Sequence, residues 1–269
     1  MHKFRMRLLA TAAILTMSGA AYAADLAVKA PPPVAPAPVT NWTGFYVGAQ
    51  IGGASFDPSC HTGNVGGFAL SDFGLDPCFA SSGEGIHSGG LSSGSVLGGG
   101  RIGYDYQWGK VVWGVVGQFD WTHLDGTATT ANSFGTGSVL SANETINWLA
   151  SARGRVGWAF DNVLFYATAG VAWTQIKAST GFVEPFDAAL DFAGQTSSDK
   201  TGAVAGGGFE YRVTPNVSFV GELLWYGFGT TTVNAPSDFI IGNVVKPTIT
   251  TQFTNQDILA GTLGVNYRF

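Results

Sequence analysis

Few side chains in this chain could perform chemistry, and histidine and cysteine are the scarcest of them. After the N-terminal segment the histidines are His61, His87 and His123, and the two cysteines are Cys60 and Cys78. Such groups can bind metal or act as base and nucleophile. The cysteines lack the ligand spacing of a metal site, and no serine motif accompanies His123. The sequence therefore predicts neither an enzyme, nor a metal site, nor a cofactor.

The arginines and carboxylates are a second set of side chains that could perform chemistry. They belong together because they occupy the same alternate positions of the segments in which polar and apolar residues alternate. Paired carboxylates can perform acid–base chemistry. Interleaved arginines favour a structural network instead, since mutual pairing offsets the cost of burying charge. The residues predicted to form this charge network are Arg101, Asp105, Asp120, Arg153, Arg155, Glu210, Glu222 and Arg268.

Eight predicted strands must position these side chains. In each segment one parity is mostly apolar, aromatic or glycine, and the other carries the polar groups, which is the period of a β-strand. The segments are residues 44–54, 96–108, 111–123, 145–160, 163–176, 202–213, 217–226 and 254–269.

Three of the connections between these segments are very short, namely Gly109-Lys110, Asp161-Asn162 and Thr214-Pro215-Asn216. The other connections are far longer. Short turns at one rim and long loops at the other are typical of outer-membrane β-barrels. The predicted fold is all-β, an eight-stranded antiparallel up-and-down transmembrane β-barrel with short periplasmic turns and four long external loops.

The aromatic residues of the apolar parity distinguish a membrane barrel from a soluble β-sandwich. A sandwich shows the same alternation but places its aromatics centrally, against a facing sheet. Here they lie near both ends of several strands, as expected for belts at the two membrane surfaces. The predicted belt residues are Trp108, Trp113, Trp121, Trp148, Trp158, Trp173, Trp225 and Phe269.

The charged parity must then face the lumen, because an arginine facing lipid near the bilayer midplane costs about 2–4 kcal/mol. An eight-stranded barrel has an interior just wide enough for side chains to fill. The sequence thus predicts a lumen filled by charged side chains and no wide pore.

The N-terminal region reads as an export signal followed by a spacer. Basic Lys3, Arg5 and Arg7 precede an apolar stretch and small residues, which predicts a signal peptide over residues 1–23. A proline-rich periplasmic leader is predicted over residues 24–41 and the barrel over residues 42–269. In an exported chain Cys60 and Cys78 are expected to form a disulfide.

The charge balance argues against a nucleic-acid partner. Removing the three basic residues of the signal peptide lowers the number of lysines and arginines from 13 to ten, against 18 acids. A nucleic-acid-binding surface needs a basic patch, and none remains.

Three motifs resemble the alphaproteobacterial outer-membrane β-barrel proteins, the small porin-like major surface antigens. They are Asn41-Trp42-Thr43-Gly44-Phe45-Tyr46-Val47-Gly48, then Gly207-Gly208-Phe209-Glu210-Tyr211 with Glu222, and the closing Gly264-Val265-Asn266-Tyr267-Arg268-Phe269. The resemblance implies an outer-membrane location with both termini periplasmic and contact with lipid and lipopolysaccharide. It also implies insertion machinery that reads the C-terminal strand, and a role in envelope integrity.

Two alternatives remain open. Some members of the family look like haemin-binding or adhesion factors, so His61 and His87 in the first loop motivate a haemin- or host-ligand-binding surface protein. The polar lumen motivates a small-solute channel. The sequence identifies no ligand for the loops.

Overall fold

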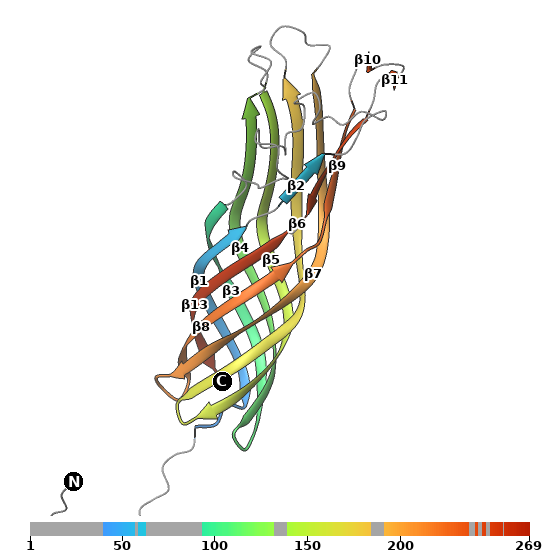
Figure 1. Ribbon diagram of the computed structural model, residues 1–269. Coiled ribbons are helices and arrows are strands. Elements are labelled where there is room, and N and C mark those ends of the chain that lie inside the picture. Colours follow the sequence, from blue (N-terminus) through green and yellow to red (C-terminus); the bar gives the residue numbers. More distant parts are fainter. Residues whose placement is uncertain are drawn as a thin grey trace, which may run out of the picture. The chain divides into compact units, whose positions relative to one another are not determined.

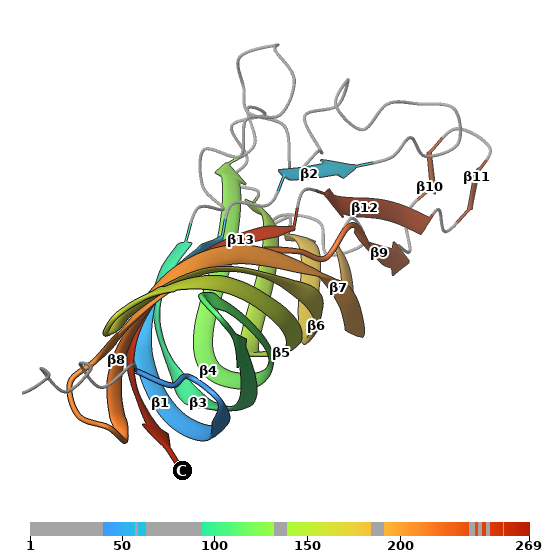
Figure 2. The ribbon, with the colours of Figure 1, turned by 90° about the horizontal axis from the view of Figure 1, so that it is seen from below.

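Eight strands close into one antiparallel barrel, and this confirms the predicted fold. The computed structural model describes residues 40–56, 59–62, 93–131, 139–183, 191–236, 240–241, 244–245, 248–254 and 256–269. Around the barrel the strand order is β1-β13-β8-β7-β6-β5-β4-β3, and the first and last barrel strands pair to close the ring (Figures 1 and 2). The strands are β1 Gly44–Phe56, β3 Ser93–Trp108, β4 Val111–Ala131, β5 Val139–Phe160, β6 Val163–Val183, β7 Phe192–Arg212, β8 Val217–Gly227 and β13 Asp257–Arg268.

The three predicted short turns lie at one end of the barrel, which we call the turn end; the opposite end is the loop end. Gly109 and Asp161 adopt the left-handed conformation, with φ of 62° and 47°. Two-residue hairpin turns need such positive φ values, which glycine and aspartate tolerate. Both ends of the barrel-forming chain also lie here, because Arg268 N donates to Asn216 O in the third turn and Phe269 N donates to Phe45 O.

Most strands are longer than the alternation predicted, and four of them by a wide margin. β4 continues to Ala131, β5 starts at Val139, and β6 and β7 pair as far as Phe182 and Phe192. Residues 192–198, for which the alternation predicts no strand, therefore belong to β7. The prediction failed there because, after Phe192, both parities of this stretch are polar or small, so no alternation marks it as a strand.

Further strands lie beyond the loop end of the barrel. β2 Ser59–Thr62, β12 Thr248–Thr254 and β9 Thr231–Pro236 form a three-stranded sheet in that order, and β10 Ile240–Ile241 pairs with β11 Val244–Val245. Ala142 of β5 and Ala178 of β6 pack with Val233 of β9 and Phe253 of β12. We call this region, formed by the outer ends of β4–β7 with β9 and β12, the extension.

None of the described residues belongs to a helix long and apolar enough to cross a membrane.

Candidate functional site

The charged residues of the lumen gather into two clusters. The lower network, nearer the turn end, joins Asp105, Arg155, Glu210 and Arg268. Arg155 Nε donates to Asp105 Oδ1 at 2.7 Å, and Arg155 Nη1 donates to Glu210 Oε2 at 3.2 Å. Arg268 Nη2 donates to Asp105 Oδ2 at 2.7 Å. All four side chains are buried, so these ion pairs are shielded from water.

The upper network is centred on Glu222. Arg101 Nη2 lies 2.9 Å from Glu222 Oε2, and Arg153 Nη2 lies 3.4 Å from the same oxygen. The Tyr166 hydroxyl donates to Glu222 Oε1 at 2.8 Å. One carboxylate therefore compensates two buried guanidinium groups.

Asp120 joins the upper network through amides rather than through arginine. Gln50 Nε2 donates to its Oδ1 and Gln118 Nε2 to its Oδ2, both at 2.6 Å. The two amides link the Asp120 carboxylate to the cations, because Gln50 Oε1 accepts from Arg101 and Gln118 Oε1 accepts from Arg153. The structure thus brings together all eight residues of the predicted network, four acids and four arginines, in two clusters of balanced charge.

Inward-facing tyrosines, which the sequence analysis did not single out, pack against the lower network. The guanidinium carbon of Arg155 lies 4.7 Å from the centre of the Tyr46 ring and 4.9 Å from that of Tyr166. Such cation–π contacts stabilise a desolvated cation. Gly103 leaves the room for this packing, because the Tyr46 ring fills the space that a side chain there would need.

Apolar side chains fill the lumen on both sides of the charges, which corrects the prediction of a lumen filled by charged side chains. At the turn end a cap contains Trp42, Val112, Leu164 and Val220. Towards the loop end a larger plug is formed mainly by Phe56, Leu97, Leu124, Ile146, Leu149, Ile176, Val204, Leu224, Tyr226 and Ile258. The prediction was incomplete because it assumed that the inward side chains are as polar at the outer end of each strand as they are in its middle.

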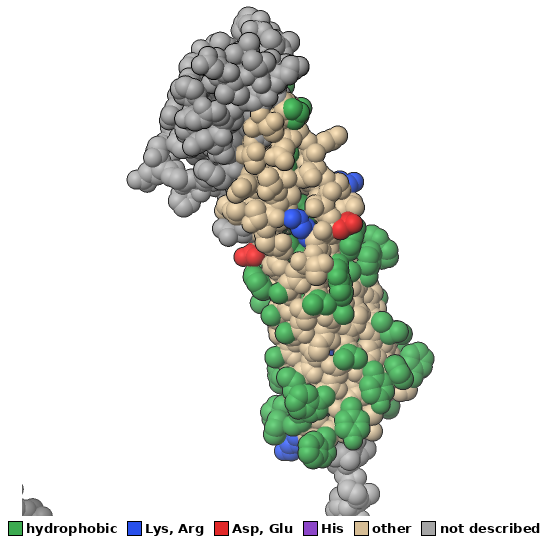
Figure 3. Space-filling view, turned by 90° about the vertical axis from the view of Figure 1, so that its right-hand side faces the viewer, with side chains coloured by type: hydrophobic (Ala, Val, Ile, Leu, Met, Phe, Trp, Pro, Cys, Tyr) green, Lys and Arg blue, Asp and Glu red, His purple; other side chains and the backbone are tan. Residues whose placement is uncertain are grey.

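The predicted belt residues all lie on the outer surface. Seven of them are exposed, and Trp148 is half-buried because its ring stacks on Phe119 with 5.9 Å between centroids. Trp108, Trp113, Trp158 and Phe269 lie near the turn end, whereas Trp121, Trp148, Trp173 and Trp225 lie towards the loop end. Figure 3 shows apolar side chains gathered over the barrel and a mostly polar surface beyond them.

The extension contains a buried acid outside this apolar band. Glu144 lies four residues beyond Trp148 along β5, is fully buried, and accepts a hydrogen bond from Gln256 Nε2. Burial raises the pKa of Glu144 to about 8, although the hydrogen bond from Gln256 and the charge of Lys200 act in the opposite direction. Gln256 in turn accepts from the Thr231 hydroxyl at 3.1 Å, which connects the acid to β9.

His123 lies on the outer face near the loop-end belt. Its Nε2 lies 2.8 Å from Asp125 Oδ2 and its Nδ1 lies 3.0 Å from Asn147 Oδ1. These exposed partners, a carboxylate and an amide, orient the imidazole at the surface.

Several predicted residues lie outside the described residues. Cys78 and His87 are among them, and for Cys60 and His61 only the backbone in β2 is described. The disulfide and the haemin hypothesis therefore stay predictions, as do the signal peptide and the leader.

A comparison with known proteins shows to which family the barrel belongs. The family model of the outer membrane protein beta-barrel domain matches residues 9–269. The chain belongs to this family. It is an outer-membrane β-barrel protein, as the closed sheet and the apolar outer band of the barrel also indicate.

Curated relatives in this family span most of the chain. The 31 kDa outer-membrane immunogenic protein of Brucella melitensis is 26% identical, with 93% of each chain covered. The 25 kDa outer-membrane immunogenic protein of Brucella abortus is 25% identical over the whole of both chains. A 22 kDa outer membrane protein of Rhizobium leguminosarum is 28% identical over 67% of this chain and 62% of its own. The resemblance drawn from the three sequence motifs is thereby confirmed.

Solved structures similar to this family member include two outer-membrane proteins. OprG of Pseudomonas aeruginosa is 12% identical, with 86% of this chain and 99% of OprG covered and a TM-score of 0.44. Neisserial surface protein A is 15% identical, with 84% and 98% covered and a TM-score of 0.37. The family assignment rests on the sequence matches.

Proposed function

We propose that this chain is a non-catalytic, surface-exposed structural protein of the outer membrane, with a lumen that conducts no solute. The observation that carries the proposal is the layered filling of the lumen: apolar cap, two charge-balanced networks, apolar plug. A continuous aqueous path would have to cross the plug, and an apolar constriction opposes the passage of ions and water.

The same layering supports a role in envelope integrity. Every carboxylate of the networks is bonded to arginine, amide, tyrosine or serine groups. These bonds make the interior rigid, and the interior supports the lipid-facing barrel. The outer band supplies the contact with lipid and lipopolysaccharide. We further propose that the closing strand β13 is what the insertion machinery reads.

We propose that the loop end faces the exterior and the turn end the periplasm. Short turns are periplasmic in outer-membrane barrels, and both ends of the barrel-forming chain lie at the turn end here. The two Brucella relatives are named as immunogenic proteins, which supports a surface-exposed extension in this chain.

The test is conductance of the purified, folded chain in planar bilayers, with a general porin in the same bilayers as the positive control. We expect no stable steps from this protein, because its interior is packed. Reproducible, sizeable steps from the heat-modifiable, folded form would reject the sealed lumen and favour the solute channel.

A further inference from the structure

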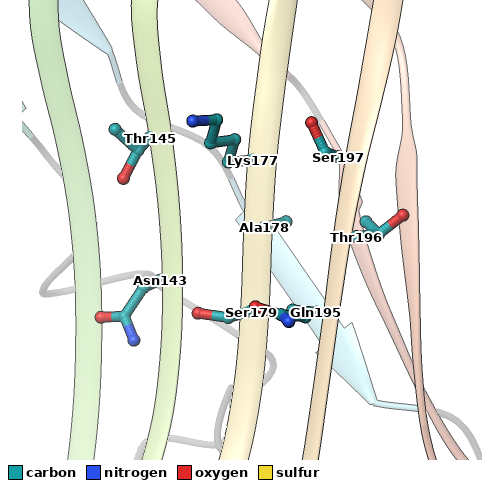
Figure 4. Close-up of a pocket in the computed structure, with 8 residues that line it drawn as sticks. All are labelled: Asn143, Thr145, Lys177, Ala178, Ser179, Gln195, Thr196 and Ser197. Atoms are coloured by element: carbon teal, nitrogen blue, oxygen red, sulfur yellow. The ribbon is translucent and has the colours of Figure 1, made fainter.

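An open polar groove lies on the outer face of the extension, just beyond the loop-end belt. It has a volume of 430 Å³ and crosses β5, β6 and β7. Two rows of side chains form it, because the strand register places Thr145, Lys177 and Ser197 in one row and Asn143, Ser179 and Gln195 in the next (Figure 4). Three hydroxyls, two carboxamides and one ammonium group therefore meet on one surface.

The polar side chains of this groove are free of partners among the described residues. None of the six side chains hydrogen-bonds or ion-pairs with another residue in the described parts of the chain. The next row towards the membrane behaves differently, since Gln175 Nε2 donates to Asp199 Oδ1 at 3.1 Å and so occupies that carboxylate. In Figure 4 the Lys177 ammonium group extends towards Thr145 across the space between β5 and β6.

This donor set suits an anionic oxygen cluster attached to a saccharide. An ammonium group with flanking hydroxyl and amide donors is a typical phosphate partner, because charge-assisted hydrogen bonds to phosphate are strong. The additional amide and hydroxyl groups can both donate to and accept from sugar hydroxyls. None of the described residues that line the groove is aromatic, so Lys177 offers the strongest anchor for a ligand, and its ammonium group favours an anion.

The height of the groove above the belt identifies the source of such a ligand. Lys177 lies four residues beyond Trp173 on the outward parity of β6. At a rise of about 3.4 Å per residue and a tilt of about 40°, this is about 10 Å along the bilayer normal. A group at this height lies beside the headgroups of the leaflet that the belt borders.

We infer that this groove binds the phosphorylated saccharide headgroup of the outer-leaflet glycolipid, with Lys177 on the phosphate and the Asn143 and Thr145 side chains on the sugar. The inference rests on the proposed function in one respect, namely that the loop end faces the exterior. It goes further than the proposed contact with lipopolysaccharide by naming the part of the lipid that is bound and the residues that contact it.

The experiment is native mass spectrometry of the folded full chain in detergent, titrated with a bis-phosphorylated lipid A. The variants are Lys177→Met, Lys177→Arg and Lys110→Met, the last removing a lysine from the exposed turn at the opposite end. Loss of one charge-assisted contact should weaken binding about tenfold in Lys177→Met. Lys177→Arg and Lys110→Met should bind as the parent does.

Two further ligands test the chemistry. A dephosphorylated lipid A lacks the anion, and phosphatidylglycerol has a phosphate without the saccharide, so both should bind at least several-fold more weakly. Equal binding of either lipid, or equal weakening by Lys110→Met, would overturn the inference. Heat-modifiable mobility verifies folding of each variant. Conductance plays no part in this assay, so an open channel would reject the proposed function and leave the binding result standing.

Discussion

At the scale of single residues, Glu222 is the central acid of the upper network. It compensates Arg101 and Arg153 together and also accepts from Tyr166. Removal of one partner from a buried ion pair leaves an uncompensated charge, and this costs far more than the net stabilisation that the pair provides. The position is therefore far more sensitive than an acid on the surface.

We expect Glu222→Gln to lower the free energy of unfolding by about 3–5 kcal/mol, since two buried guanidinium groups then share no anion. Urea unfolding of the chain in micelles, followed by tryptophan fluorescence, measures this. Asp199→Asn is the matched control, because Asp199 is exposed and its hydrogen-bond donor among the described residues is Gln175. Equal effects of the two substitutions would show that the upper network does not depend on Glu222.

At the scale of elements, the extension has an interior of its own, distinct from the lumen of the lipid-facing barrel. Its interior joins β5 and β6 to β9 and β12 through a small apolar cluster. Glu144 and Gln256 lie in the same interior and connect β5 to the segment that precedes β13. We therefore expect the stability of β9 and β12 to depend on the protonation of Glu144.

The sign of this dependence follows from the raised pKa of Glu144. The folded value of about 8 lies above the ordinary 4.5, so the folded state holds its proton more tightly. The stabilisation is complete below pH of about 4.5 and is lost as pH rises towards and through about 8. We expect hydrogen exchange in Thr231–Pro236 and Thr248–Thr254, corrected for intrinsic rates, to accelerate from pH 5 to pH 9.

Glu144→Gln mimics the protonated acid, so it should remove this acceleration. Asp125→Asn changes an exposed acid on the neighbouring strand and should retain it. An unchanged pH profile in Glu144→Gln would assign the dependence to another group.

At the scale of the whole molecule, lipid replaces the second layer that a β-sheet ordinarily needs. The outer band exposes large apolar side chains over the barrel, while the lumen is packed like a protein core. A closed barrel satisfies every backbone group within the sheet, which is the condition for placing strands in a bilayer. Depth in the bilayer then decides which outward substitutions are tolerated.

We expect Ala152→Arg, on the outward parity about midway between Trp148 and Trp158, to destabilise the barrel in lipid by about 2–4 kcal/mol. Val213→Arg, directly before the third turn, should cost about 0–1 kcal/mol. Chemical unfolding in phospholipid vesicles gives both values. Similar costs at both sites would contradict the placement of the band in hydrocarbon.

The sequence by itself determined the number of barrel strands, their short turns and their two faces. Alternation around Arg153 and Arg155, the turn at Asp161-Asn162 and the paired tryptophans are local patterns, and the two-residue period of a strand fixes which side chains share a face. The lumen residues could be chosen for the same reason, since a charged side chain cannot face lipid cheaply.

Only the tertiary structure decided which of these residues meet and what lies beyond them. Glu222 and Arg101 come from strands that are not neighbours, so their contact depends on the closure and stagger of the barrel. Tyr46 beside Arg155, the apolar plug, and β9 packed on β5 and β6 arise in the same way. Contacts across a lumen depend on the register of all eight strands, which no single stretch of sequence encodes.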